Sequence, residues 1–330
     1  YNSKEKIGDN MKKRYVIILG IILLAIIPIL FFINIEILKS YLFWLFLTAF
    51  VTISLFFVID IQAIAPKAVK EKHTVIEMQY HNRKVFILNP KNKPNMGDVI
   101  FYLHGGSYVI EATYKHWKFL EDLVADTGMT LILPDYPLTP KYTYKEVFEM
   151  IEPLYKDVLA KLGDRKLILM GDSAGGGMAL ALLEKLSETE CRKPNKTILL
   201  SPWLDVTMNN PKITKELQMQ DPTLIKDVLK IAGKAYSGQD GMDNYLVNPI
   251  KGPIKDLKNI TLYTGTYDIL NPDAHDFFER AKKENVEIDF RETEKAIHIW
   301  MTYREKKQYA SEETYKDIVN LLKEVKKSEV

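Results

Sequence analysis

The sequence of 330 residues contains a single cysteine, Cys191, so no intrachain disulfide can form. It has no CxxC pair and no His/Cys cluster with the spacing of a zinc site, and we expect neither a metal nor an organic cofactor. An excess of one charge is also lacking, because 45 basic and 43 acidic residues are mixed along the chain and leave a net charge of +2. This balance argues against a nucleic-acid-binding protein.

Long apolar runs occur near the N-terminus. Residues 15–33 carry no charge and are long enough for a transmembrane helix. A second run, residues 41–59, follows after a connector just long enough to turn a helical hairpin. We therefore predict an N-terminal transmembrane hairpin and linker over residues 1–72. A single span or an interfacial helix is the alternative. A secretory signal peptide starting at Met11 is disfavoured by the length of the run and by the lack of a small-x-small cleavage site.

Basic residues flank both apolar runs, which predicts that both ends of this segment, and the domain that follows it, lie in the cytoplasm. A single span would move that domain to the other side. The flanking residues are Lys4, Lys6, Lys12, Lys13 and Arg14 before the runs, and Lys67, Lys70 and Lys72 after them. The chain begins at Tyr1, and we interpret residues 1–10, which precede Met11, as either a fragment end or a non-native addition.

From residue 73 to 330, short β-rich runs alternate with longer helical patterns, as in an α/β fold whose mostly parallel sheet has helices on both faces. The first two runs alternate apolar with polar residues, which predicts an antiparallel hairpin at the sheet edge. The predicted strands are 73–80, 83–88, 98–103, 129–134, 166–171, 196–201, 260–265 and 287–292. The predicted helices are 115–127, 145–162, 175–187, 272–284 and 311–326.

Residues from about 207 to 248 do not fit this alternation. They contain one amphipathic helical pattern, residues 223–236, and stand between two predicted core strands. We predict that this insertion is a helical lid on the single domain of residues 73–330.

A G-x-S-x-G motif, Gly171 to Gly175, stands between a predicted strand and an Ala-, Gly- and Leu-rich helix. This is the strand, turn and helix context of a nucleophile elbow, which predicts that Ser173 is a nucleophile. The alternative readings are an ordinary glycine-rich turn and a phosphate loop. The phosphate loop fails, because no Lys-Ser or Lys-Thr pair follows the glycines.

A glycine-rich segment, His104-Gly105-Gly106-Ser107, follows the earlier predicted strand 98–103. Hydrolases that use a nucleophile elbow place the loop that stabilises an oxyanion at this point. Two backbone N–H groups must point at the developing charge, and glycine lets the chain approach closely. The alternative is a Gly-Gly turn beside a packed histidine.

The acid and the base of a triad should follow the nucleophile in the order Asp or Glu, then His. Asp268 comes just after a predicted strand, and His298 lies beyond the next strand, so both fall at the carboxyl edge of the sheet. The other histidines precede the core, lie in helical patterns or belong to the glycine loop. Asp273 is the rival acid but lies inside the following helical pattern.

These motifs resemble the hormone-sensitive-lipase branch of the α/β-hydrolase superfamily, which includes bacterial carboxylesterases and arylacetamide-deacetylase-like enzymes. The resemblance covers residues 99–300 and rests on HGGS, DYPLTPKYTYKEV, GDSAG, SPWLDV, GTYDILNPDA and AIHIW in that order. It implies an α/β-hydrolase fold, a triad of Ser173, Asp268 and His298, and an oxyanion hole from the N–H groups of Gly106, Ser107 and Ala174. Gly105 shapes the turn. Ser107 stands where the family usually has a third glycine, so a positive φ there would be strained.

The expected reaction is hydrolysis of carboxylic esters through an acyl-enzyme, on a small-molecule or lipid-like substrate at a membrane. The alternatives are an amidase or deacetylase acting on acylated small molecules, and a non-catalytic receptor with a hydrolase fold. The sequence leaves the oligomeric state, the acyl length and the alcohol group open.

Overall fold

The computed structural model describes residues 44, 63–91, 97–304 and 310–327. The chain divides into two compact units, residues 1–60 and 61–330, and the fold below is that of the second. The predicted spans 15–33 and 41–59 lie outside the described residues except at Trp44. Among the residues that are described, no helix has both the length and the apolar character that crossing a membrane requires.

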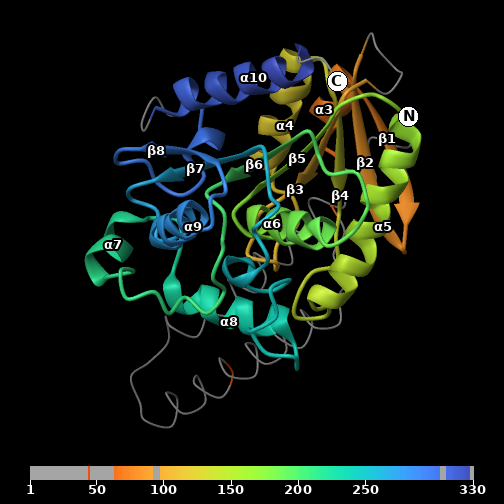
Figure 1. Ribbon diagram of the computed structural model, residues 1–330. Coiled ribbons are helices and arrows are strands. Elements are labelled where there is room, and N and C mark those ends of the chain that lie inside the picture. The colour runs from red at the N-terminus through yellow and green to blue at the C-terminus, as the bar shows by residue number, and fades with distance from the viewer. Residues whose placement is uncertain (1–43, 45–62, 92–96, 305–309, 328–330) are drawn as a thin grey trace. The chain divides into compact units, whose positions relative to one another are not determined.

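One eight-stranded sheet runs through the described part of the second unit (Figure 1), in the order β1-β2-β4-β3-β5-β6-β7-β8. The pairs β1–β2 and β2–β4 are antiparallel, and the other neighbours are parallel. Each predicted strand is observed with ends within two residues of the prediction. The strands are β1 (His73–Tyr80), β2 (Arg83–Pro90), β3 (Val99–Leu103), β4 (Thr130–Pro134), β5 (Leu167–Asp172), β6 (Lys196–Leu200), β7 (Ile260–Gly265) and β8 (Ile288–Thr293).

The edge hairpin forms because the two residues between β1 and β2 accept left-handed backbone. His81 has φ 46° and Asn82 has φ 60°. Positive φ at both central residues is the geometry of the two-residue turn that matches strand twist, and asparagine tolerates it well.

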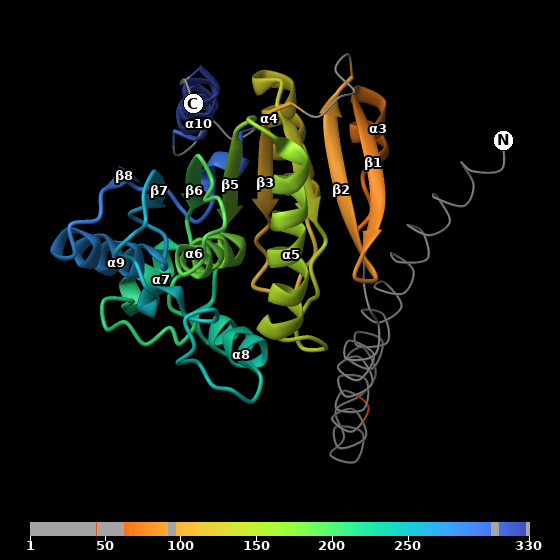
Figure 2. The same cartoon turned by 45° about the vertical axis from the view of Figure 1, so that its right-hand side comes forward.

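Helices cover both faces of the sheet (Figure 2), because alternate residues of the central strands point to opposite sides. On β3, Ile100 and Tyr102 pack with α4 and α10, whereas Val99, Phe101 and Leu103 pack with α5, α6 and α9. The two hydrophobic cores therefore share one sheet, as the sequence predicted. These helices are α4 (Tyr114–Thr127), α5 (Tyr144–Leu162), α6 (Ala174–Ser187), α9 (Asn271–Lys283) and α10 (Ser311–Lys327).

The insertion between β6 and β7 contains α7 (Lys215–Gln220), α8 (Lys226–Ser237) and the short 3-10 helix η2 (Pro249–Lys251). The inner face of α8 is buried at Leu229, Ala232 and Tyr236, which join the core on the α5 and α6 side. Helix α7 was not predicted, since six residues are too few to give a clear period. The ring of Tyr236 stacks on that of Tyr108, with centroids 3.7 Å apart.

Residues 63–72 pack against the rest of the second unit and include a short helix, α3 (Lys67–Lys72), which the sequence did not predict. The side chains of Ala63, Ala65 and Val69 are buried. The N–H of Ala63 donates to Asp135 Oδ2 at 3.0 Å, and Asp135 directly follows β4. The chain therefore enters this unit at the carboxyl edge of the parallel strands.

Candidate active site

Ser173 occupies a sharp turn between the end of β5 and the start of α6, with φ 53° and ψ −123°. The two glycines of the motif are required because backbone atoms lie too close to leave room for a side chain. A Cβ on Gly171 would lie 2.3 Å from the carbonyl oxygen of Gly175, and one on Gly175 would lie 2.0 Å from that of Leu103. Such strained backbone persists only where the surroundings hold it, and this turn presents the serine hydroxyl at the carboxyl edge of the sheet.

The structure brings Ser173, His298 and Asp268 into one hydrogen-bonded line. His298 Nε2 lies 2.9 Å from Ser173 Oγ, and His298 Nδ1 lies 2.8 Å from Asp268 Oδ2. The other oxygen of Asp268 accepts the N–H of Leu270 at 2.9 Å. Because a carboxylate only accepts, Nδ1–H donates to Asp268 and Nε2 is free to accept from the serine hydroxyl. The three side chains come from the loops and turns that follow β5, β7 and β8, although they are up to 125 residues apart in sequence.

The electrostatics of His298 favour its protonated form. Burial lowers the pKa of this imidazole, but the charge of Asp268 and its hydrogen bond outweigh burial and raise it above 6.5, with further contributions from Asp221 and Asp172. A base that becomes positive when it accepts a proton is thus stabilised by buried carboxylates.

The loop after β3 approaches Ser173 so closely that Gly105 admits no side chain. A Cβ there would lie 2.3 Å from Asp172 Oδ2 and 2.9 Å from the Ser173 Cβ. The next residues turn with positive φ: 120° at Gly106, 55° at Ser107 and 64° at Tyr108. Position 107 therefore has the left-handed backbone that glycine favours, and the serine there is strained.

Of the N–H groups in the predicted oxyanion hole, that of Gly105 already has an acceptor in the protein, whereas those of Gly106, Ser107 and Ala174 have none among the described residues. The Gly105 N–H donates to Asp172 Oδ1 at 2.9 Å and is occupied. In the described part of the chain, the N–H groups of Gly106 and Ser107 donate to no protein acceptor. Ala174 is the first residue of α6, so its N–H has no partner within the helix. These three groups are thus available to a ligand.

Asp172, to which the sequence analysis gave no role, joins the serine turn to the glycine loop. Its buried carboxylate also accepts from the Tyr102 hydroxyl at 2.7 Å and lies 3.1 Å from His116 Nε2. Burial raises the pKa of Asp172, but the charge and hydrogen bond of His116, with the bonds from Tyr102 and Gly105, lower it below its usual value. Its place inside the G-x-S-x-G motif was the only sequence signal.

His104 supports the loop in its neutral form. Burial lowers its pKa to about 3, with a further contribution from His116. Its ring stacks on that of Tyr136 at 4.2 Å, and the Tyr136 hydroxyl donates to the His104 carbonyl at 2.6 Å. The Asp-Tyr-Pro segment after β4 thus holds the glycine loop from its other side.

The rival acid, Asp273, lies in the first turn of α9, where its Oδ1 accepts from Asn210 Nδ2 at 2.8 Å. Its Oδ2 is buried without a hydrogen-bond partner. Burial raises its pKa to about 7. Asp268, rather than Asp273, therefore has the geometry to orient His298.

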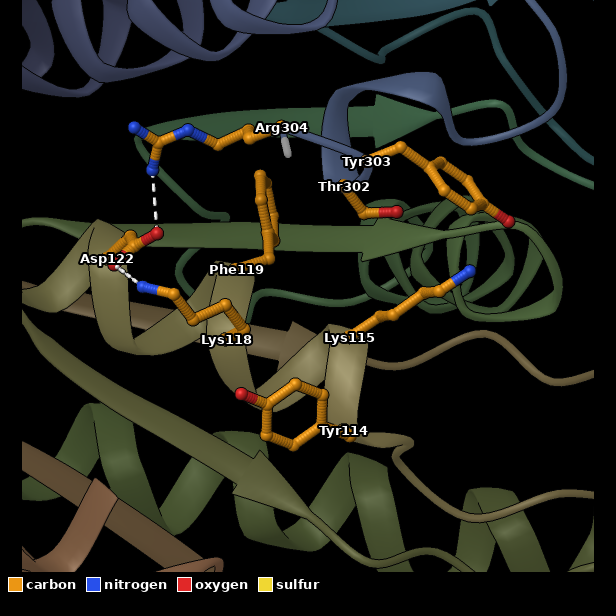
Figure 3. A pocket seen from close by; sticks show the side chains of 8 residues that line it. All are labelled: Tyr114, Lys115, Lys118, Phe119, Asp122, Thr302, Tyr303 and Arg304. Atoms are coloured by element: carbon orange, nitrogen blue, oxygen red, sulfur yellow. Dashed lines mark hydrogen bonds and ion pairs between the residues drawn. The ribbon is translucent and has the colours of Figure 1, made fainter. Parts of the chain in front are cut away.

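A separate pocket lies between α4 and the segment around η3 (Trp300–Thr302), and none of the three aligned residues lines it (Figure 3). Its charged side chains already interact with protein groups. Lys118 and Arg304 each lie 2.6 Å from an oxygen of Asp122, and Lys115 Nζ lies 3.8 Å from the centre of the Tyr303 ring. This pocket does not present a nucleophile aligned with a base.

The chain is similar to known proteins in both sequence and structure. Residues 100–302 match the family described as alpha/beta hydrolase fold. An esterase from Acinetobacter venetianus is 29% identical over 203 residues, which are 61% of this chain and 67% of that protein. The hormone-sensitive lipase of Mus musculus is 25% identical over 162 residues, which are 47% of this chain and 21% of the lipase.

Among solved structures, a hormone-sensitive lipase from a metagenome library is similar with a TM-score of 0.70 and 23% identity, covering 77% of this chain and 85% of that one. The resemblance to the hormone-sensitive-lipase branch is thus confirmed, as is the mostly parallel α/β-hydrolase fold. The predicted enzyme class, a carboxylic ester hydrolase, is also confirmed by relatives that are esterases and lipases.

Proposed function

Because this chain belongs to the α/β hydrolase fold family, we propose that it hydrolyses carboxylic esters with Ser173 as nucleophile, His298 as base and Asp268 as acid. The observation that carries the proposal is the position of His298 between the other two, at 2.9 Å from Ser173 Oγ and 2.8 Å from Asp268 Oδ2. A hydroxyl, a base that can take its proton and a carboxylate that orients the base are what nucleophilic acyl transfer needs.

In the acylation step, Ser173 Oγ attacks the ester carbonyl carbon while its proton passes to His298 Nε2. Asp268 holds Nδ1–H and stabilises the imidazolium. When the tetrahedral intermediate collapses, the bond to the alcohol oxygen breaks and His298 returns its proton to that oxygen. Water then attacks the acyl-enzyme with His298 again as base, which releases the acid and restores the Ser173 hydroxyl.

The negative charge on the carbonyl oxygen is stabilised by the N–H groups of Gly106, Ser107 and Ala174. The support for this part of the proposal is that no protein acceptor among the described residues takes these donors. The start of α6 adds the positive end of a helix at the same point. Fixed donors in a buried site are worth far more than they would be in water.

The proposal extends to a membrane-anchored enzyme with its catalytic unit on the cytoplasmic side. The support is the length and apolar composition of residues 15–33 and 41–59 and the basic residues that flank them. The chain also enters the hydrolase unit at Ala63, on the sheet edge that carries Ser173. A lipid-like ester presented at a membrane is therefore the proposed substrate.

Three basic residues follow the second apolar run, and they give the proposed membrane location less support than the sequence suggested. Each forms an ion pair: Lys67 with Glu71 at 3.2 Å, Lys70 with Glu77 at 2.6 Å and Lys72 with Glu121 at 2.5 Å. Their charge is partly compensated within the protein, so we do not assign them to lipid headgroups.

The test is hydrolysis of p-nitrophenyl esters of graded acyl length by the full chain in detergent, compared with Ser173→Ala. Loss of a triad serine costs on the order of 10⁶ in kcat in a well-studied serine protease. We expect a comparable loss with an unchanged circular dichroism spectrum. A fluorophosphonate probe should label the parent at Ser173 and leave the variant unlabelled. Activity within about tenfold of the parent would refute the nucleophile assignment.

Anchoring is tested separately by expressing the full chain and a chain lacking residues 11–60 and comparing membrane pelleting. Recovery of both chains in the soluble fraction would contradict the anchor and leave the esterase proposal intact. Protease accessibility of the hydrolase unit in sealed vesicles then reports its side of the membrane.

A further inference from the structure

Asp221 is a buried carboxylate of the predicted lid, the insertion of residues 207–248 between β6 and β7. It lies between α7 and α8, and its two oxygens accept from different parts of the molecule. Oδ1 accepts from the lid itself: from the N–H groups of Thr223 at 2.8 Å and Leu224 at 3.2 Å, and from the Thr223 hydroxyl. Oδ2 accepts from the N–H of Ile269 at 3.1 Å. Asp221 is 4% exposed. One side chain therefore connects the lid to the residue that follows Asp268.

Two carboxylates accept the backbone N–H groups of the turn that follows Asp268. Asp268 Oδ1 accepts the N–H of Leu270, while the N–H of Ile269 goes to Asp221. Asp268 Oδ2, left free by these bonds, reaches His298 Nδ1. A shift of Ile269 would rotate the Asp268 backbone and change the hydrogen bond to the imidazole. Displacements of about 1 Å at such a site can cost on the order of 10² in rate.

We propose that Asp221 is a positioning residue for the reaction: from the predicted lid, it fixes the turn that carries Asp268, and it adds its own buried negative charge to those that stabilise the His298 imidazolium. The proposal rests on the proposed function, since it assigns Asp268 and His298 their triad roles. Its consequence is that the placement of the lid forms part of the active site, because the bond from Ile269 exists only while the segment between α7 and α8 is in place.

Among the residues that the structure describes, the charges that raise the pKa of His298 come from three elements. They are Asp268 after β7, Asp221 from the lid and Asp172 at the end of β5. Asp268 contributes both charge and a hydrogen bond, whereas Asp221 and Asp172 act on His298 through charge. Charges buried in this way are screened little by salt. Removal of the Asp221 charge should therefore make the His298 imidazolium less stable.

Asp221→Asn is the first test. An amide has one acceptor and one donor side, so it can serve the lid N–H groups or Ile269 but not both. We expect kcat to fall about ten- to a hundredfold with KM changed less than threefold. The midpoint of the acid limb of kcat/KM should move to lower pH. The matched control is Asp227→Asn, an exposed carboxylate in the first turn of α8, which changes the lid by the same charge.

Two further variants separate positioning from simple anchoring of the lid. Thr223→Val removes a hydroxyl that donates to Asp221 but keeps the charge, so it should lower thermal stability and leave the acid limb in place. Asp221→Glu keeps the charge but shifts it, so kcat should fall while the acid limb stays near that of the parent. This variant also serves if Asp221→Asn folds poorly.

Three results would overturn the proposal: an unchanged kcat in Asp221→Glu, an unmoved acid limb in Asp221→Asn, or the same shift in the Asp227→Asn control. An unmoved limb together with lower stability would make Asp221 a lid anchor only. Failure of the proposed function itself has a different signature, because Ser173→Ala would then keep its activity whatever Asp221 does.

Discussion

Asp172 Oδ1 lies 2.9 Å from the amide nitrogen of Gly105 and accepts its hydrogen bond. This contact joins the residue before the proposed nucleophile to the loop that supplies the proposed oxyanion donors. The two segments are 67 positions apart in sequence. Asp172 therefore holds the turn of Ser173 close to the glycine loop, which sets the distance between the proposed nucleophile and the proposed oxyanion donors.

Asp172→Asn should accordingly lower kcat more than it raises KM. Loss of a single oxyanion donor costs about 10² to 10³ in kcat, and a displaced loop should cost between about tenfold and that value. The measurement is steady-state hydrolysis of a p-nitrophenyl ester. Asp98→Asn is the control, because Asp98 also accepts a backbone N–H, that of Lys166 at 2.9 Å, but lies outside the active site. Equal losses in the two variants would refute this role.

Ser107→Gly should stabilise the protein. A left-handed backbone costs a non-glycine residue about 1 to 2 kcal/mol, whereas the extra freedom of glycine in the unfolded chain costs about 0.4 to 1 kcal/mol. The free energy of unfolding should therefore rise, by up to about 1.6 kcal/mol, in urea denaturation. Ser187→Gly, at the end of α6 with ordinary helical backbone, should lower it instead. A loss at both positions would mean that Ser107 is not strained.

The pH dependence of activity should reflect the raised pKa of His298. As a base, His298 must be neutral before attack, so activity is lost as pH falls through its pKa. Because that pKa lies above 6.5, the acid limb of kcat/KM should have its midpoint above pH 6.5. A midpoint at or below 6.5, with a substrate that does not ionise, would contradict the electrostatic account of the site.

Asp268→Asn and Asp273→Asn should have different effects on activity. The first should reduce kcat by about 10⁴, as the equivalent change does in a well-studied serine protease, because an amide cannot hold the required imidazole tautomer. The second should leave kcat within about threefold of the parent, since Asp273 pairs with Asn210 and not with His298. The reverse order of losses would assign the acid role to Asp273.

Asp273 also predicts how stability varies with pH. Its pKa is raised from 3.8 to about 7, so the folded state binds this proton more tightly than the unfolded state. The stabilisation is present below pH 3.8 and is lost as pH rises toward 7. An asparagine at position 273 cannot ionise. The free energy of unfolding of Asp273→Asn, measured in urea, should therefore increase relative to that of the parent as the pH rises from 4 to 7. A difference that is constant with pH would contradict this assignment.

Much of the fold was accessible from the sequence because buried parallel strands are continuous apolar runs and the helices between them are long enough to show a period. Helices α3 and α7, with six residues each, are too short for that signal. The meeting of Ser173, Asp268 and His298 at one edge of the sheet could be predicted, because a strand, a sharp turn and a fixed chain order constrain their positions. The contacts of Asp172, His116 and Asp221 could not be predicted, because they join segments far apart in sequence and these residue types are common on surfaces.

The buried contact between Ala63 and Asp135 bears on how the hydrolase unit can be isolated. A recombinant fragment that starts at His73, where the sheet begins, would remove Ala63, Ala65 and Val69 and uncover the apolar surface beneath them. It would also remove the Ala63 N–H, which donates to the same Asp135 carboxylate that pairs with Arg83. A fragment that starts at Ile61 retains these contacts and is the better choice for crystallisation and for proteolysis-resistance assays.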